Sequence, residues 1–330
     1  MTTLLAGDIG GTKTLLALYE LGSGGELRLQ RSELFPSADW DDLAPMVQTF
    51  LTSGDPTPAA ACLAVAGPVE GGQARLTNLS WQLDEGQLQQ ATGISRIELV
   101  NDFAVLIYGL PHLSPTQAAP IRSGVARADA PLLVLGAGTG LGVAYGVPTP
   151  SGLVAVASEA AHGEFAPRSQ VEWELKQWLA NELGLGRVSI ERVVSGTGLG
   201  DVARWMLASR HPKGDHPLCA LPERADLPAA VAAAASGADA LAGDALKLWI
   251  SCYGSVCGDL ALAGLARGGI WLAGGTAGKL LEALRAPGFQ QAFLNKGRLT
   301  PVLASMPITA LIDPAIGQFS AACRARMLVA

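Results

Sequence analysis

Two glycine-rich stretches, each lying between apolar runs, contain the residue types best suited to hold an anion. They read Gly7-Asp8-Ile9-Gly10-Gly11-Thr12 and Gly138-Thr139-Gly140-Leu141-Gly142. Glycine lets backbone N–H groups approach a phosphate closely and tolerates positive φ, and the threonine adds a hydroxyl donor. Either stretch alone could be an ordinary hairpin turn. Their repetition favours two related half-domains, each presenting a phosphate loop to a shared cleft.

Asp8 and the pair Asn101-Asp102 stand where strands are expected to end. The negative charge of Asp8 opposes phosphate but suits a phosphate-bound Mg²⁺. Ligands of open α/β sheets bind at the carboxyl ends of strands, so Asp102 could take the proton of a substrate hydroxyl that attacks a γ-phosphate. An Asx-turn or a helix N-cap is the alternative interpretation of Asn101-Asp102.

Glu159 and His162 lie three residues apart and could point the same way from one turn, toward adjacent hydroxyl groups of a ligand. A structural or solvated histidine is the alternative for His162. Glu191, next to Arg192, could equally form a surface ion pair. The four histidines have no HExxH or other zinc spacing, which makes metal ligation a weak option.

Gly274 and Gly275 follow an apolar strand and would let a flat ring lie against the backbone, although a helix-starting turn is the simpler interpretation. Residues 77–80 form a polar loop before Trp81 that could line a sugar pocket. Three motifs are absent: the GxxxxGK[ST] of P-loop NTPases, a strand-linked GxGxxG and the GxSxG of serine hydrolases.

The expected elements alternate between strand and helix, which predicts an α/β protein. Residues 60–66 form a continuous apolar run, typical of a strand buried on both faces. The segment 113–129 is polar and is expected to lead into a second domain. The other elements expected are a hairpin over 3–21, strands over 27–34, 97–100 and 269–273, and helices over 39–51, 83–92, 170–183, 191–207, 229–266 (broken near Gly237 and Gly243), 277–284 and 313–327, the last capped by Asp313-Pro314.

The composition of the chain excludes several classes of function. The chain has 330 residues, of which 49% are hydrophobic and 16% charged, enough for two packed domains. Its net charge of −6 argues against nucleic acid as a partner. No leader or membrane span is expected, and the five scattered cysteines predict buried thiols in a reducing compartment. We therefore expect a cytoplasmic protein without membrane or nucleic-acid partners.

The motifs together resemble bacterial glucokinases of the ATP-dependent hexokinase group, in the actin-like (ribonuclease-H-like) ATPase superfamily. The resemblance runs through nearly the whole chain. The residues that carry it are Gly7-Asp8-Ile9-Gly10-Gly11-Thr12, Thr77-Asn78-Leu79-Ser80-Trp81, Leu99-Val100-Asn101-Asp102-Phe103, Gly138-Thr139-Gly140-Leu141-Gly142, Ser158-Glu159 with His162, Glu191-Arg192-Val193-Val194-Ser195-Gly196 and Ala273-Gly274-Gly275.

The resemblance implies a two-domain α/β fold with the active-site cleft between the domains. The small domain would comprise 1–110 and 304–330, and the large domain 111–303. It further implies transfer of the γ-phosphoryl group of ATP to the C6 hydroxyl of glucose, the first step of glycolysis, by an enzyme that uses Mg²⁺ and is commonly a homodimer.

The same resemblance assigns roles to residues. Asp102 would be the catalytic base, and Asp8 would hold Mg²⁺ through water. The residues that would hold glucose are Asn101, Asp102, Glu159, His162 and Glu191. Those that would meet ATP are Gly7, Asp8, Ile9, Gly10, Gly11 and Thr12 on one side, Gly138, Thr139 and Gly140 on the other, and Gly274 and Gly275 at the adenosine.

Two departures from the family pattern stand out. Ala160 and Ala161 replace the usual glycines between the glutamate and the histidine, which puts the shape of this loop in question. The zinc-binding cysteine cluster of the related repressors and sugar kinases is missing, so no zinc is expected. A sugar-responsive transcription factor, a chaperone or filament ATPase, and a kinase for mannose, N-acetylglucosamine or fructose are the alternatives, and the phosphoryl donor also stays open.

Overall fold

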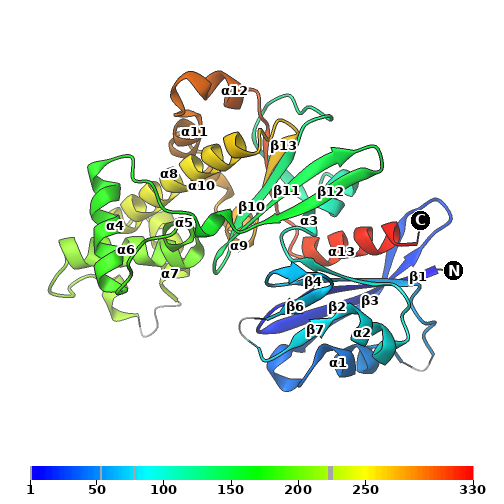
Figure 1. Cartoon of the computed structure of the whole chain (residues 1–330). Coiled ribbons are helices and arrows are strands. Elements are labelled where there is room, and N and C mark those ends of the chain that lie inside the picture. The colour runs from blue at the N-terminus through cyan, green and yellow to red at the C-terminus, as the bar shows by residue number, and fades with distance from the viewer. Residues whose placement is uncertain (1, 53, 77–78, 222–225, 330) are drawn as a thin grey trace. The chain divides into compact units, whose positions relative to one another are not determined.

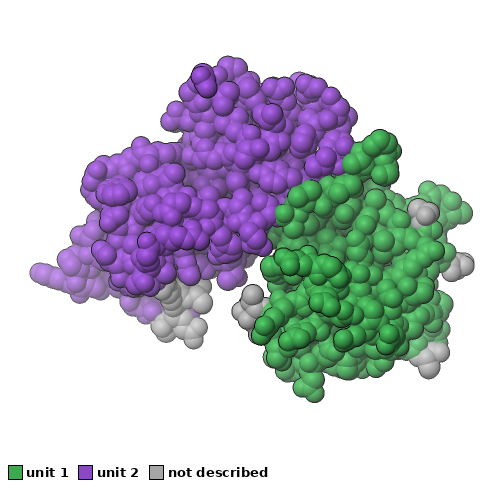
Figure 2. Space-filling model, viewed as in Figure 1, with its two compact units in different colours: residues 1–117, 149–157, 313–330 green, residues 118–148, 158–312 purple. Residues whose placement is uncertain are grey.

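The computed structural model describes residues 2–52, 54–76, 79–221 and 226–329. They form two compact units (Figures 1 and 2). Unit 1 comprises residues 1–117, 149–157 and 313–330, and unit 2 comprises 118–148 and 158–312. Whether the chain folds as domains with the limits 1–110 plus 304–330 and 111–303 stays a prediction.

Unit 1 is built on a five-stranded sheet with the order β3-β2-β1-β4-β8. Strand β1 is antiparallel to β2 and parallel to β4, and β4 is parallel to β8. A separate three-stranded sheet has the order β5-β6-β7. The strands are β1 (Thr2–Ile9), β2 (Lys13–Leu21), β3 (Leu27–Pro36), β4 (Ala60–Val65), β5 (Val69–Glu70), β6 (Gln73–Arg75), β7 (Gln82–Asp84) and β8 (Ile97–Asn101).

Helices cover both faces of the large sheet of unit 1. Helix α13 lies along one face and contacts β1 and β4, whereas α1 and α2 lie on the other face (Figure 1). All six residues of β4 are buried, as the apolar run predicts. The helices are α1 (Leu43–Phe50), α2 (Glu85–Thr92), α3 (Leu106–Gly109) and α13 (Ile316–Met327).

A six-stranded sheet, with the order β12-β11-β10-β13-β14-β9, repeats the plan of the first. Strand β10 is antiparallel to β11 and parallel to β13, and β13 is parallel to β14. The order β12-β11-β10-β13-β14 therefore matches β3-β2-β1-β4-β8, which confirms the predicted repetition. The strands are β9 (Ala118–Arg122), β10 (Leu132–Ala137), β11 (Leu141–Thr149), β12 (Gly152–Ser158), β13 (Gly269–Ala273) and β14 (Ile308–Leu311).

A large helical layer completes unit 2 around the buried helix α8, which contacts α6, α7 and α11. The predicted break at Gly237 separates α7 from α8, but Gly243 lies inside α8 and breaks nothing. The helices are α4 (Gln170–Glu182), α5 (Ile190–Val193), α6 (Gly196–Arg210), α7 (Leu227–Ser236), α8 (Ala240–Ala263), α9 (Gly275–Lys279), α10 (Leu281–Arg285), α11 (Pro287–Leu294) and α12 (Thr300–Ala304).

The composition led us to expect buried thiols and no membrane span, and the structure bears on both expectations. All five cysteines are free; Cys219 is exposed, contrary to expectation, and the others are buried. Burial raises the pKa of the Cys323 thiol to about 11, so this group stays protonated at neutral pH. Within the described ranges, none of the helices combines the length and the apolar character needed to cross a membrane.

Candidate active site

The first glycine-rich stretch is a tight hairpin turn of unit 1. Strand β1 ends at Ile9 and β2 begins at Lys13, and the N–H of Gly10 donates to the Lys13 carbonyl oxygen at 3.0 Å. Thr12 is exposed at the tip of the turn. The hairpin thus presents backbone N–H groups and a threonine hydroxyl, the donors that a phosphate group requires.

Ser37 fastens this hairpin, a role that the sequence analysis did not foresee. Its buried hydroxyl donates to the Gly10 carbonyl oxygen at 2.8 Å and lies 3.0 Å from the Thr14 hydroxyl. Its N–H donates to the Thr12 carbonyl oxygen at 3.0 Å. Ser37 follows the turn by some twenty-five residues and matches no motif, so no local signal could have identified it.

Asp8 lies at the end of β1 with its carboxylate against the first turn of α13. Burial raises the pKa of this carboxyl group above its ordinary value. A Cβ atom at Gly317 would lie 2.8 Å from Asp8 Oδ2, so glycine in α13 is what leaves room for the carboxylate. The N-cap of α13 is Ala315 rather than the predicted Asp313, whose side chain accepts from the Ala315 N–H at 2.9 Å.

The surroundings of Asp8 fit a magnesium ion that arrives with a nucleotide. Mg²⁺ prefers oxygen ligands and is often held by one or two carboxylates together with substrate phosphates and water. Asp8 supplies one such carboxylate beside the hairpin. No cluster of three or more histidine, cysteine, aspartate or glutamate residues that could form a closed metal cage occurs in the part of the chain that the structure describes.

Asn101 and Asp102 form a hydrogen-bonded loop where β8 ends. Asn101 Oδ1 accepts from the N–H groups of Phe103 and Ala104, both at 3.1 Å, which is the Asx-turn considered above. Asn101 Nδ2 donates to the Gly67 carbonyl oxygen at 3.1 Å and to Asp102 Oδ1 at 3.0 Å. Both amide donors of Asn101 are therefore engaged, and one of them orients the Asp102 carboxylate.

The second glycine-rich stretch forms the matching hairpin of unit 2. Strand β10 ends at Ala137 and β11 begins at Leu141, and the N–H of Gly138 donates to the Gly140 carbonyl oxygen at 2.8 Å. Thr139, like Thr12, is exposed. The threonine tip and the glycine turn thus occur twice, as the sequence predicts.

The start of α6 fastens the second hairpin. The N–H of Gly196 donates to the Gly138 carbonyl oxygen at 2.7 Å, and the Thr197 hydroxyl donates to the Thr139 carbonyl oxygen at 2.9 Å. Ser195 caps α6 by accepting from the Gly198 N–H at 2.9 Å. Residues 194 and 195 therefore divide the helix expected over 191–207, and the start of α6 is the junction that supports the hairpin.

Glu159 and His162 lie on the same side of one turn, as their spacing predicts. The short 3₁₀ turn Ala160–His162 places them on the same side, with 3.4 Å between Glu159 Oε2 and His162 Nε2. Neither Ala160 nor Ala161 has a positive φ. The alanines that replace the family glycines thus fit this turn without backbone strain.

Glu191 accepts a hydrogen bond from the second hairpin. Its Oε2 atom accepts from the Leu141 N–H at 2.9 Å, so the interpretation of a surface ion pair with Arg192 does not describe it. Glu191 also lines a hollow of about 500 Å³ on unit 2, together with His162, Leu185, Gly186, Arg187, Ser189 and Arg192. Two of the predicted sugar-binding side chains thus share one hollow.

Gly274 packs directly behind the second hairpin. Its φ is +81°, and a Cβ atom there would lie 2.8 Å from the Ala137 carbonyl oxygen, which also accepts from the Thr276 hydroxyl at 2.7 Å. No atom lies within 4 Å of the Cβ position at Gly275. Gly274 therefore has a packing reason to be glycine, and Gly275 leaves open backbone of the kind a ring could lie against.

The polar loop before Trp81, which could line a sugar pocket, is only partly described by the structure. Thr77 and Asn78 lie outside the described residues. Trp81 is buried in the core of unit 1, where its indole N–H donates to the Trp40 carbonyl oxygen at 3.0 Å. Trp81 is thus a residue of the hydrophobic core of unit 1.

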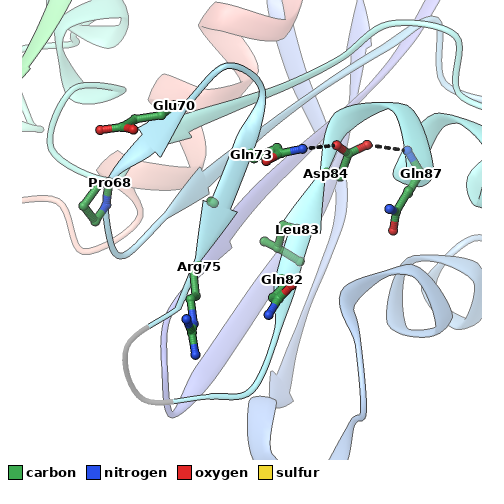
Figure 3. Close-up of a pocket in the computed structure, with 9 residues that line it drawn as sticks. Pro68, Glu70, Gln73, Arg75, Gln82, Leu83, Asp84 and Gln87 are labelled. Atoms are coloured by element: carbon green, nitrogen blue, oxygen red, sulfur yellow. Dashed lines mark hydrogen bonds between the residues drawn. The ribbon is translucent and has the colours of Figure 1, made fainter.

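A second hollow, of about 640 Å³, lies on the small sheet of unit 1 (Figure 3). Its lining comes from residues between Pro68 and Gln87 and contains none of the predicted site residues. Asp84 on its wall accepts from Gln73 Nε2 at 3.0 Å and from the Gln87 N–H at 2.9 Å. Asp84 is thus hydrogen-bonded to both Gln73 and Gln87 on the wall of this hollow.

Known proteins match this chain over its whole length. A family model described as Glucokinase matches residues 5–328. The glucokinase of Nostoc punctiforme is 39% identical over 342 residues, covering 99% of this chain and 100% of the relative. The crystal structure of glucokinase from an Antarctic psychrotroph has 31% identity and a TM-score of 0.83, covering 98% of this chain and 99% of that one.

A more distant structure shares the fold. The ROK family glucokinase from Streptomyces griseus, solved in complex with glucose and AMPPNP, has 18% identity and a TM-score of 0.66 and covers 98% of this chain and 99% of its own. Together with the mixed sheets of both units, these likenesses confirm the predicted α/β fold of the actin-like kinases.

Proposed function

The chain belongs to the glucokinase family, and from this premise we propose how its residues phosphorylate glucose. It is an ATP-dependent hexose kinase that transfers the γ-phosphoryl group of ATP to glucose. The observation that carries this conclusion is the match to the glucokinase family model over residues 5–328, together with a glucokinase that is 39% identical over 99% of this chain.

Asp102 is the proposed general base. A base must hold its acceptor oxygen toward the attacking hydroxyl, and the hydrogen bond from Asn101 Nδ2 to Asp102 Oδ1 restrains the carboxylate. The loop around it is stiffened by the bonds from Asn101 Oδ1 to two backbone N–H groups. Asp102 accepts the proton of the C6 hydroxyl while that oxygen attacks the γ-phosphorus, and ADP departs.

Glu159, His162 and Glu191 are the proposed sugar ligands of unit 2, and Asn101 and Asp102 those of unit 1. Carboxylates accept from sugar hydroxyls, and imidazole can either donate or accept. The pair Glu159–His162 and the hollow that His162 shares with Glu191 support the assignment. A site that bonds each hydroxyl rejects analogues that lack one, because its polar groups would then stay unpaired.

The two hairpins are the proposed phosphate-binding elements. The backbone N–H groups around Gly11 and Thr139 and the hydroxyls of Thr12 and Thr139 would donate to phosphate oxygens, and Gly274 and Gly275 would border the adenosine. Asp8 would hold Mg²⁺ through water, and Mg²⁺ held there would supply positive charge to the phosphates. Location in the cytoplasm, assembly as a homodimer and the absence of zinc stay predictions.

The test compares Asp102→Ala with the wild type in a coupled ADP-release assay with Mg-ATP and glucose. We expect kcat to fall by about 10²- to 10⁴-fold, the usual contribution of a general base. Asp129→Ala is the matched control, because Asp129 is exposed and pairs only with Arg127 in the same loop; its kcat should equal that of the wild type.

Two results would contradict the proposal at different levels. An Asp102→Ala variant with wild-type kcat would exclude Asp102 as the base and leave the kinase assignment intact. If the wild type phosphorylates mannose, fructose or N-acetylglucosamine and not glucose, the phosphoryl transfer would stand and the assigned substrate would be wrong.

A further inference from the structure

Glu191 contacts two parts of unit 2, the second hairpin and the hollow with His162, which the proposed function gives to different ligands. Its Oε2 atom accepts from the N–H of Leu141, the residue directly after the second hairpin, at 2.9 Å. The same side chain lines the hollow that contains His162. One carboxylate therefore touches both the proposed phosphate element and the proposed sugar pocket.

Gly140, inside the hairpin, is what leaves room for this arrangement. A Cβ atom at Gly140 would lie 2.4 Å from Glu191 Oε2 and 3.1 Å from its Cδ. Real Cβ atoms essentially never approach another atom as closely as 2.4 Å, and they rarely approach one as closely as 3.1 Å. The φ of Gly140 is not positive, so the backbone conformation itself accepts any residue. A side chain at this position would therefore require the Glu191 carboxylate to shift away from the hairpin.

Gly138, at the other end of the same turn, provides the contrast. No atom lies within 4 Å of its Cβ position. The two glycines thus share a hairpin, and only Gly140 constrains Glu191.

We propose that Gly140 is a positioning residue for the sugar, acting through Glu191. By lacking a side chain, Gly140 lets Glu191 bind the hairpin through Oε2 and leaves Oε1 for a glucose hydroxyl. The inference rests on the proposed function, because it takes Glu191 as a sugar ligand. It follows that a side chain at position 140 of the phosphate hairpin weakens sugar binding, and a change in this sugar carboxylate weakens ATP binding.

The first test measures glucose affinity by calorimetry in the absence of nucleotide. Gly140→Ala should raise the glucose Kd about tenfold or more, the scale expected when a hydrogen bond to a charged group is lost. Gly138→Ala should leave the glucose Kd unchanged. In a Glu191→Ala background, Gly140→Ala should cause no further loss, because the carboxylate that it displaces is absent.

The second test does not depend on a tolerated alanine in the turn. Glu191→Gln keeps the shape of the side chain and weakens the acceptor for the Leu141 N–H, so the KM for ATP at saturating glucose should rise several-fold or more. Glu159→Gln is the matched control, because the polar contact of Glu159 is with His162; it should raise only the KM for glucose.

The outcomes separate this inference from the proposed function. If the wild type binds and phosphorylates glucose but Gly140→Ala keeps the wild-type glucose Kd, the inference is wrong and the function stands. Equal KM values for ATP in Glu191→Gln and Glu159→Gln would also overturn it. If the wild type neither binds nor phosphorylates glucose, the function fails and the inference fails with it.

Discussion

The two glycine hairpins have the same plan and different supports. Each joins two antiparallel strands, and each exposes a threonine at its tip. The first is held by one buried side chain, that of Ser37, which bonds to the Gly10 carbonyl oxygen. The second is held by the start of a 15-residue helix, through Gly196 and Thr197. The turn is thus the same in both units, whereas the groups that anchor it differ.

The hairpins also differ in the charge beside them. Asp8 stands two residues before Gly10, and the equivalent place before Gly138 is occupied by Gly136. The carboxylate beside the second hairpin is instead Glu191, which comes from α5 and lines the same hollow as His162. From this difference and the proposed function we infer a division of tasks, in which the first hairpin would work with the metal and the second with the sugar.

Asp8→Asn is the variant that would break this division most clearly. Replacing the carboxylate with an amide removes the charge that is proposed to hold Mg²⁺ through water, and such changes cost roughly 10- to 100-fold in activity. Titration of Mg²⁺ in the ADP-release assay should show a higher requirement for the metal and an unchanged KM for glucose. A wild-type Mg²⁺ profile would show that the first hairpin has no special link to the metal.

The same variant should gain stability. Burial raises the pKa of the Asp8 carboxyl group, so the folded state keeps this proton to a higher pH than the unfolded state does. Its contribution to stability is therefore complete below the unfolded pKa and is lost as the pH rises through the folded pKa. At pH 7 the ligand-free Asp8→Asn protein should have a higher Tm than the wild type, and the difference should shrink in acid.

Ser37→Ala tests the anchor of the first hairpin. The Gly10 carbonyl oxygen would lose a buried hydrogen bond, which typically costs about 1–3 kcal/mol of unfolding free energy. Urea unfolding measures this loss, and the KM for ATP should rise because the turn loosens. The exposed Ser305, whose hydroxyl donates to the Val302 carbonyl oxygen in the same turn, is the control; its alanine variant should stay within about 0.5 kcal/mol. Equal stability of the two variants would argue against the anchor.

Thr197→Val should have the smallest effect. It removes the hydroxyl that donates to the Thr139 carbonyl oxygen, but this contact is exposed and the Gly196 N–H still holds the hairpin. We expect a loss of about 0.5–1 kcal/mol and at most a small rise in the KM for ATP. A loss as large as that of Ser37→Ala would mean that both hairpins depend on a single anchor.

The local part of the site could be predicted from the sequence. Both hairpins, the buried strand β4 and the pair Glu159–His162 follow from residue types and short spacings. The contacts between distant segments could not, because Ser37, Glu191 and Gly317 reach their partners only after the sheets have formed. The short strands β5, β6, β7, β9 and β14 also escaped prediction, since runs of two to five residues are too short to establish a pattern of apolar and polar side chains.

The packing of α13 on β1 has a consequence for the synthesis of the protein. Gly317 lies beside Asp8, so the side of unit 1 that carries Asp8 is enclosed by a helix that follows all of unit 2 in the chain. That face of strands β1 and β4 therefore stays uncovered until unit 2 has been translated. A product cut short before residue 316 would expose this apolar face and lack the wall behind Asp8, so incomplete chains should be inactive and prone to aggregate.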